Sequence, residues 1–115
     1  MRKIAIFAFN GDIMCFAHGL FNALDMAAKG HEVRLIIEGS ATGLIRDLTD
    51  EKNPFSSFYS QVRDLGLLEG ICRACAQKMG TLEEAKAQGI PLLGEAYGHP
   101  AMVDYMEKGY EIITL

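Results

Sequence analysis

The chain has 115 residues, half of them hydrophobic and 23% charged, which is enough for one domain spanning 1–115 with its own core. The net charge of −4, without a lysine or arginine run, argues against nucleic acid and anionic membranes as partners. No apolar run reaches the roughly 18 residues of a membrane span. No export signal is recognised, and three cysteines, an odd number, fit poorly with a framework of disulfides. We therefore expect a cytoplasmic protein with reduced thiols.

The first part of the chain predicts a strand, a helix and a second strand. A continuous apolar run at 3–9 is typical of a strand that helices cover on both faces. The turn Asn10-Gly11-Asp12 follows, and Asp12 is a suitable N-cap for the amphipathic helix expected at 13–29. A second apolar strand is expected at 33–37.

The middle of the chain begins with a loop of small residues at 38–43. A short helix is expected at 44–48 and, after a polar linker, a longer helix at 55–65. An apolar third strand at 67–71 then ends directly before Cys72.

The last part of the chain continues the alternation. Two helices are expected at 74–79 and 81–88, and a short fourth strand at 90–93 contains a proline, which suits a position near the edge of a sheet. Gly98-His99-Pro100 should open a last helix that ends at residue 108. A final strand is expected at 110–115.

Strands that alternate with helices predict a three-layer α/β/α fold with a mostly parallel sheet of about five strands. Ligands of such folds bind outside the carboxyl ends of the strands. The predicted order brings four segments to that edge, and they are 10–12, 38–43, 72–75 and 93–100.

Cys72 stands where the third strand meets the following helix. Backbone N–H groups and the helix dipole at such a junction favour a thiolate, which is the reactive form of cysteine. Cys75 lies three residues later on the same helix face, so a disulfide or a shared persulfide is geometrically feasible. We expect sulfur transfer or thiol redox chemistry here, with an inert buried thiol as the alternative. Cys15, on the first helix, is expected to be a core residue.

The other candidate crevice residues have simpler explanations beside the functional ones. His99 could donate a proton or steady a thiolate, or it could be an ordinary loop residue. Asn10, Asp12 and Ser40 are most simply turn formers and helix caps, and they become functional only if the crevice holds a ligand. No nucleotide-binding motif is present, and one CxxC with scattered histidines is a weak zinc signal, so no cofactor or metal is predicted.

The chain resembles the DsrE/DsrF-like (TusD-like) sulfur-relay family in three stretches. They are the segment from Ile71-Cys72-Arg73-Ala74-Cys75 to Gly80, the lead Gly30-His31-Glu32-Val33 into the second strand, and the ending Gly109-Tyr110-Glu111-Ile112-Ile113. The resemblance covers nearly the whole chain. The family's sulfur-carrying cysteine lies eight residues before a glycine, which implies that role for Cys72. It also implies a compact α/β protein that assembles as a homotrimer or homohexamer. Cys75 departs from the simplest family pattern.

We therefore expect a sulfur-relay protein, a candidate sulfurtransferase, that carries a persulfide on Cys72 between a donor and an acceptor protein. One alternative is a non-catalytic oligomeric module whose crevice binds a small molecule or another protein. A further alternative is a dithiol redox or metal site formed by Cys72 and Cys75.

Overall fold

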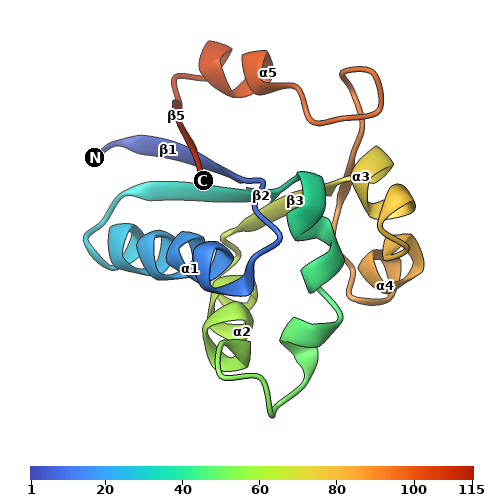
Figure 1. Cartoon of the computed structure of the whole chain (residues 1–115). Coiled ribbons are helices and arrows are strands. Elements are labelled where there is room, and N and C mark those ends of the chain that lie inside the picture. The colour runs from blue at the N-terminus through green and yellow to red at the C-terminus, as the bar shows by residue number, and fades with distance from the viewer.

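Five strands form one sheet with the spatial order β4–β3–β2–β1–β5. Figure 1 labels β3, β2, β1 and β5 of this sheet. The computed structural model describes all residues from 1 to 115. The strands are β1 (Lys3–Ala8), β2 (Glu32–Ile37), β3 (Leu68–Cys72), β4 (Leu92–Leu93) and β5 (Glu111–Thr114). Every neighbouring pair is parallel, so the predicted parallel sheet of about five strands is confirmed.

The helices cover the two faces of this sheet unequally. They are α1 (Ile13–Ala28), η1 (Gly39–Leu44), η2 (Asp47–Thr49), α2 (Ser56–Asp64), α3 (Arg73–Lys78), α4 (Leu82–Ala87) and α5 (Met102–Glu107). The chain crosses the sheet in one direction from β1 to β4 and then returns to place β5 beyond β1. Because crossovers between parallel strands are right-handed, the return puts α5 on the face opposite α1 and α2 (Figure 1). The three-layer arrangement is confirmed, with α5 as the third layer.

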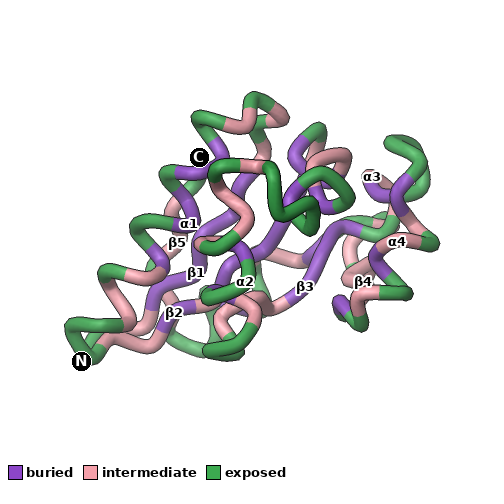
Figure 2. Tube along the Cα trace, turned by 90° about the horizontal axis from the view of Figure 1, so that it is seen from below, coloured by how far each residue is buried: buried purple, intermediate pink, exposed green.

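Alternation along the strands separates two apolar cores. The first face, toward α1 and α2, carries a cluster of 18 buried residues that extends to α3 and α4. The second face, toward α5, carries a small cluster formed by Ala5, Phe7, Ile36 and Tyr105. The buried residues run along β1, β2 and β3 through the middle of the molecule (Figure 2). Most of the apolar burial that stabilises the fold therefore lies on the first face.

A set of paired polar side chains, which we call the tyrosine network, occupies the second face. The Arg34 guanidinium donates to the Tyr110 hydroxyl over 3.2 Å and lies 3.8 Å from the Glu69 carboxylate. Tyr110 in turn donates to Glu32, and Tyr105 donates to Glu69 over 2.8 Å. Each carboxylate of the network therefore has both a hydroxyl donor and a nearby cation.

An irregularity in β3 decides which face Cys72 occupies. The pairing with β2 moves from Leu68 to Gly70 between successive residues of β2, so Glu69 is an extra residue in β3. Strict alternation from Leu68, which packs against the first core, would put Cys72 in that core as well. The extra residue changes the alternation, as a β-bulge does, and turns Cys72 toward the second face.

Some element boundaries differ from the predicted ones. The segment expected as one helix at 44–48 forms parts of the two short 3-10 helices η1 and η2. The last helix begins at Met102 rather than near Pro100, because the residues before it form a hairpin turn. No helix combines the length and the apolar character needed to cross a bilayer.

Candidate functional site at the carboxyl ends of β2, β3 and β4

Glu38 and Cys72 are neighbours because of the register between β2 and β3. Ile37 pairs with Ile71, so the next residue of each strand lies beside the other on the second face. The connection after β3 leads to α3 on the side of the first core, whereas the connection after β4 crosses to α5. Adjacent strands whose connections leave toward opposite faces create the crevice in which open α/β sheets bind ligands.

Cys72 and Cys75 are held together by the turn from β3 into α3. Cys72 is the N-cap of α3, and its Sγ accepts the backbone N–H of Cys75 over 3.3 Å. The Cys72 thiol also donates to the Cys75 Sγ, with the two sulfurs 2.9 Å apart. Since a disulfide bond is about 2.05 Å long, the pair needs only a small movement to close one. Both thiols are free in the structure.

A tight hairpin turn presents His99 to the two sulfurs. Ala96 and His99 exchange two backbone hydrogen bonds, of 2.8 and 2.9 Å. The two residues between them, Tyr97 and Gly98, have φ values of 56° and 88°, a combination typical of a type I′ turn. The Ala74 N–H at the start of α3 donates to the Gly98 carbonyl over 3.1 Å, which fixes the turn against the helix.

The imidazole of His99 contacts both thiols. Its Nδ1 lies 3.0 Å from the Cys72 Sγ and 3.5 Å from the Cys75 Sγ. These distances allow the ring nitrogen to exchange a proton with either sulfur. From the sequence, His99 could be an ordinary loop residue or a residue that acts on the thiols, and these distances place it in the site.

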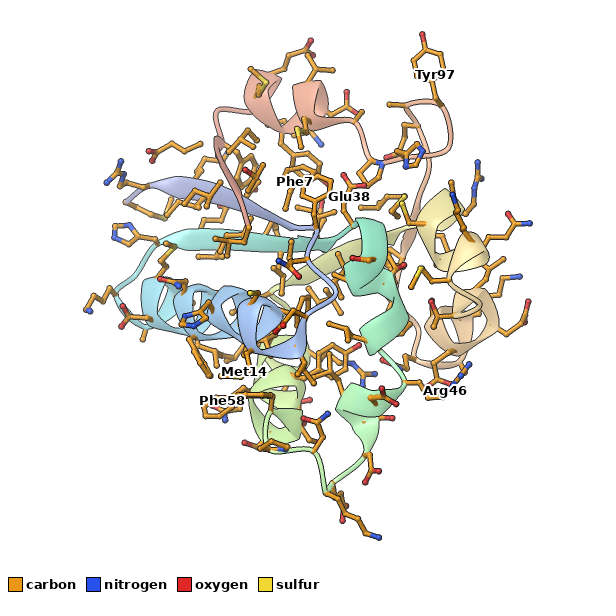
Figure 3. All side chains as sticks on the ribbon, in the orientation of Figure 1. Phe7, Met14, Glu38, Arg46, Phe58 and Tyr97 are labelled. Carbon is orange, nitrogen blue, oxygen red and sulfur yellow. The ribbon has the colours of Figure 1, made fainter.

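Glu38 is a site residue that the sequence analysis did not single out. Its side chain is buried, with 5% of the residue exposed, and Figure 3 shows it near the middle of the molecule while Tyr97 projects outward. None of the chain's ion pairs includes it. Burial raises the pKa of the Glu38 carboxyl, while a hydrogen bond with the Cys72 thiol and the charge of His99 oppose that shift. Its place after the apolar strand β2 was the available signal.

The expectation of a stabilised Cys72 thiolate is wrong. Burial raises the pKa of Cys72 to about 12, and the hydrogen bond from its thiol to Cys75 acts in the same direction. The Cys75 N–H lowers this pKa, but α3 has only six residues and its dipole is correspondingly weak. Cys72 is also fully buried, whereas Cys75 is half-buried. The accessible sulfur of the pair is therefore Cys75.

A cleft of about 340 Å³ opens beside this pair. It is lined by Gly39, Ser40, Cys75, Lys78, Met79 and His99. Segments that follow β2, β3 and β4 thus meet at one opening, as their predicted positions at the carboxyl edge implied. Three other hollows lie around α2 and contain neither cysteine nor histidine.

The remaining predicted crevice residues divide between this cleft and local structural roles. Ser40 lines the cleft, and its hydroxyl accepts the Gly11 N–H over 2.9 Å. Asn10 accepts the Asp12 N–H, and Asp12 caps α1 through the N–H groups at positions 14 and 15, so both have the turn and capping roles considered from sequence. Neither lines the cleft.

Cys15 lies apart from the cluster, and the expectation that it belongs to the core is wrong. It is exposed on α1, because the buried stripe of that helix runs through Phe16, Leu20 and Ala23. A thiol immediately before Phe16 projects to the side of that stripe. Cys15 therefore serves as an internal control for any chemistry at the other two cysteines.

Four side chains with metal-ligating or acid–base chemistry converge here, and we call Glu38, Cys72, Cys75 and His99 the Cys–His–Glu cluster. Their donor atoms all lie within 4.8 Å of one another. The arrangement offers a dithiol, a base for its protons and a carboxylate, so it suits thiol exchange chemistry or metal binding.

Comparison with known proteins gives relatives but no assigned activity. The chain is 35% identical to the uncharacterized protein MJ0733 of Methanocaldococcus jannaschii over 98 residues, which is 85% of this chain and 78% of that protein. The chain belongs to the family of that protein. An uncharacterized protein of Archaeoglobus fulgidus is 46% identical over 41 residues, which is 36% of this chain and 67% of that protein. No family model and no solved structure matches the chain.

Proposed function

We propose that the chain is a sulfur-relay protein of the DsrE/DsrF-like kind, in which Cys72 and Cys75 take sulfur from a persulfide donor and pass it to an acceptor thiol. The observation that supports this proposal is the contact of two thiols with each other and with one imidazole beside a cleft. A single buried cysteine would not need a second thiol and a base at such short distances.

The first step falls to Cys75, because it is the sulfur that reaches the cleft. His99 accepts the Cys75 proton, and the resulting thiolate attacks the outer sulfur of a donor R–S–SH. The donor S–S bond breaks, the donor sulfur takes the proton back from His99 and leaves as R–SH, and Cys75 becomes Cys75–S–SH.

The second step moves the sulfur to Cys72, the position that the family resemblance indicates. His99, whose Nδ1 lies 3.0 Å from the Cys72 Sγ, takes the Cys72 proton as that sulfur attacks the outer sulfur of Cys75–S–SH. The S–S bond breaks, His99 returns the proton to the Cys75 sulfur, and the persulfide is stored at the buried position. Burial protects a persulfide from bulk solvent. Acceptor proteins would collect the sulfur by the reverse exchange through Cys75.

Mass spectrometry of persulfidated cysteines tests this proposal. Metal-free protein is incubated with a persulfide donor, alkylated and digested, and the mass of one added sulfur is sought on each cysteine peptide. We expect the label on the pair in wild type and in Cys15→Ser, and loss of uptake in Cys75→Ser. Labelling of Cys15 at the same rate as the pair, or full uptake in Cys75→Ser, contradicts the relay.

Thiol–disulfide redox chemistry is a second candidate, because the two sulfurs lie 2.9 Å apart. In that case a donor persulfide on Cys75 would be resolved by attack of Cys72 on its inner sulfur, which releases H₂S and leaves a Cys72–Cys75 disulfide. Release of sulfide without a stable persulfide on either peptide separates this outcome from the relay. Cytoplasmic location and assembly as a homotrimer or homohexamer stay predictions, and sedimentation of the purified protein tests the assembly.

A further inference from the structure

The buried carboxyl of Glu38 is hydrogen-bonded to the Cys72 thiol, but no lysine or arginine of the chain balances its charge. It has no lysine or arginine within ion-pair distance, and only 5% of the residue is exposed to solvent. An isolated buried carboxylate is costly unless it is protonated, paired or bound to a metal. Its immediate neighbours are two thiols and an imidazole, and all of these are metal ligands.

We propose that the Cys–His–Glu cluster binds one divalent transition-metal ion of the zinc class. The ligands would be the Cys72 and Cys75 sulfurs, the His99 Nδ1 and one Glu38 carboxylate oxygen. Binding releases the two thiol protons, so the reaction of two R–SH groups with M²⁺ gives M(SR)₂ and two H⁺. This inference does not rest on the sulfur-relay proposal, although it uses the same two thiols.

The ligand types select the ion. Two thiolates and an imidazole are soft or borderline ligands, which suit Zn²⁺, Co²⁺ and Fe²⁺ and are unsuited to Mg²⁺ and Ca²⁺, because those ions take oxygen ligands. A carboxylate as the fourth ligand is poorly suited to Cu⁺. Four protein ligands match the tetrahedral coordination that zinc adopts in proteins.

The geometry is close to that of a bound ion without matching it fully. Zinc bonds of about 2.0–2.3 Å place the ligand atoms of a tetrahedron about 3.3–3.8 Å apart. The two sulfurs are 2.9 Å apart, the histidine nitrogen lies 3.0 and 3.5 Å from them, and all four ligand atoms fall within 4.8 Å. Binding therefore needs the sulfurs to separate by about 1 Å, which side-chain rotation can supply.

The local backbone favours such a site. Cys72 and Cys75 come from one strand-to-helix turn, and the hairpin that carries His99 is hydrogen-bonded to the same turn through Ala74 and Gly98. Glu38 is fixed by the register of β2 against β3. Ligands held in place by the fold lose little conformational entropy when the ion binds, which favours affinity.

Titration of reduced, chelator-treated full-length protein with Co²⁺ tests the site. We expect one equivalent per chain, with sulfur-to-cobalt charge-transfer bands and the intense visible bands of tetrahedral coordination, and displacement by Zn²⁺. Substitution of a ligand, as in Cys75→Ser, His99→Ala or Glu38→Gln, should weaken Co²⁺ binding about tenfold to a hundredfold or more. Cys15→Ser and Glu69→Gln are matched controls that should leave the affinity unchanged.

Circular dichroism and urea unfolding of each metal-free variant confirm that it is folded before titration. If Cys72→Ser does not fold, the partly exposed ligands Cys75 and His99 carry the test. An oxygen-type cobalt spectrum, or unchanged affinity in Cys75→Ser and His99→Ala, overturns the site. Unchanged affinity in Glu38→Gln overturns the four-ligand arrangement.

The metal and relay proposals fail separately. Cobalt binding is measured without any persulfide, and persulfide uptake is measured on metal-free protein. A chain that binds cobalt through sulfur and takes up no sulfur supports the metal site and refutes the relay, and the reverse result does the opposite. If both hold, stoichiometric Zn²⁺ should abolish persulfide uptake by wild type.

Discussion

The Cys–His–Glu cluster and the tyrosine network lie on the same face of the sheet, and they differ in how their acidic groups are balanced. In the network, Glu32 and Glu69 each have a tyrosine hydroxyl and Arg34 nearby. In the cluster, Glu38 faces thiols and an imidazole, with no permanent cation. The charges of the network are thus balanced within the chain, and its hydrogen bonds help to attach α5 to the sheet. The charge of Glu38 in the cluster has no permanent cation, so a proton, a metal ion or a reacting sulfur must balance it.

The largest expected effect comes from removing the anchor of the network. Tyr105 is buried and belongs to the only helix on the second face. The centroid of its ring lies 5.6 Å from the centroid of the Phe7 ring. Tyr105→Ala should lower the free energy of unfolding by about 3 kcal/mol through lost burial and a cavity. Tyr105→Phe should lower it by about 1 kcal/mol, because only the hydrogen bond to Glu69 is lost. Urea unfolding of the metal-free proteins measures both values, and equal losses would show that the ring contributes no packing energy.

A second prediction concerns the bulge that keeps the cluster on its face. A Cβ at Gly70 would lie 2.7 Å from the Leu93 side chain and from the Pro91 carbonyl, so β4 must shift to accept it. Gly70→Ala should destabilise the protein by about 1–3 kcal/mol. Gly19→Ala on α1 is the control, because its nearest neighbours are 3.7 Å away and alanine favours a helix. The two variants should therefore change the urea midpoint in opposite directions, and a stabilised Gly70→Ala contradicts the close approach of β4.

Gly70 and Glu38 also show where prediction from sequence stopped. The strands, the order of elements and the CxxC at the end of β3 were predictable, because long apolar runs and helical spacing decide them. The bulge was not, since residues 68–72 contain no polar alternation that reveals an extra residue. The nearness of Glu38 to Cys72 depends on the register between strands, and no local pattern states it. His99 was placed at a helix start, because a turn with Tyr97 at positive φ has no sequence signal.

The cysteines should differ in reactivity by at least tenfold, and this separates the buried cluster from the surface. Burial raises the pKa of Cys72 above that of a free thiol, so little of the buried sulfur is ionised near neutral pH. Cys15 is exposed, and Cys75 is half-buried beside the cleft. In metal-free protein, alkylation by iodoacetamide should be slowest at Cys72 and faster at both Cys15 and Cys75, and peptide mass spectrometry measures each rate. The Cys72 rate should keep rising with pH beyond the ordinary pKa of a free thiol, about 8.5, and a fast rate that is independent of pH would contradict the raised pKa.

The smallest expected effect concerns two glutamates whose replacement by glutamine should change the free energy of unfolding in opposite directions. Glu69→Gln removes a partner of Arg34 and of the Tyr105 hydroxyl, and it should lower the free energy of unfolding by about 0.5–1 kcal/mol, a value reduced by solvent screening. Glu38→Gln removes a buried carboxylate whose ionised form is disfavoured, so the free energy of unfolding of metal-free protein should stay the same or rise by up to about 1 kcal/mol at pH 7.

Because the folded-state pKa of Glu38 is raised, the folded protein binds its proton more tightly than the unfolded chain. Wild type should therefore lose stability relative to Glu38→Gln as the pH rises from the ordinary value of 4.5 through the raised folded value. Urea unfolding of both proteins at a series of pH values measures the difference, and a destabilised Glu38→Gln in the absence of metal would mean that Glu38 already has its partner within the chain.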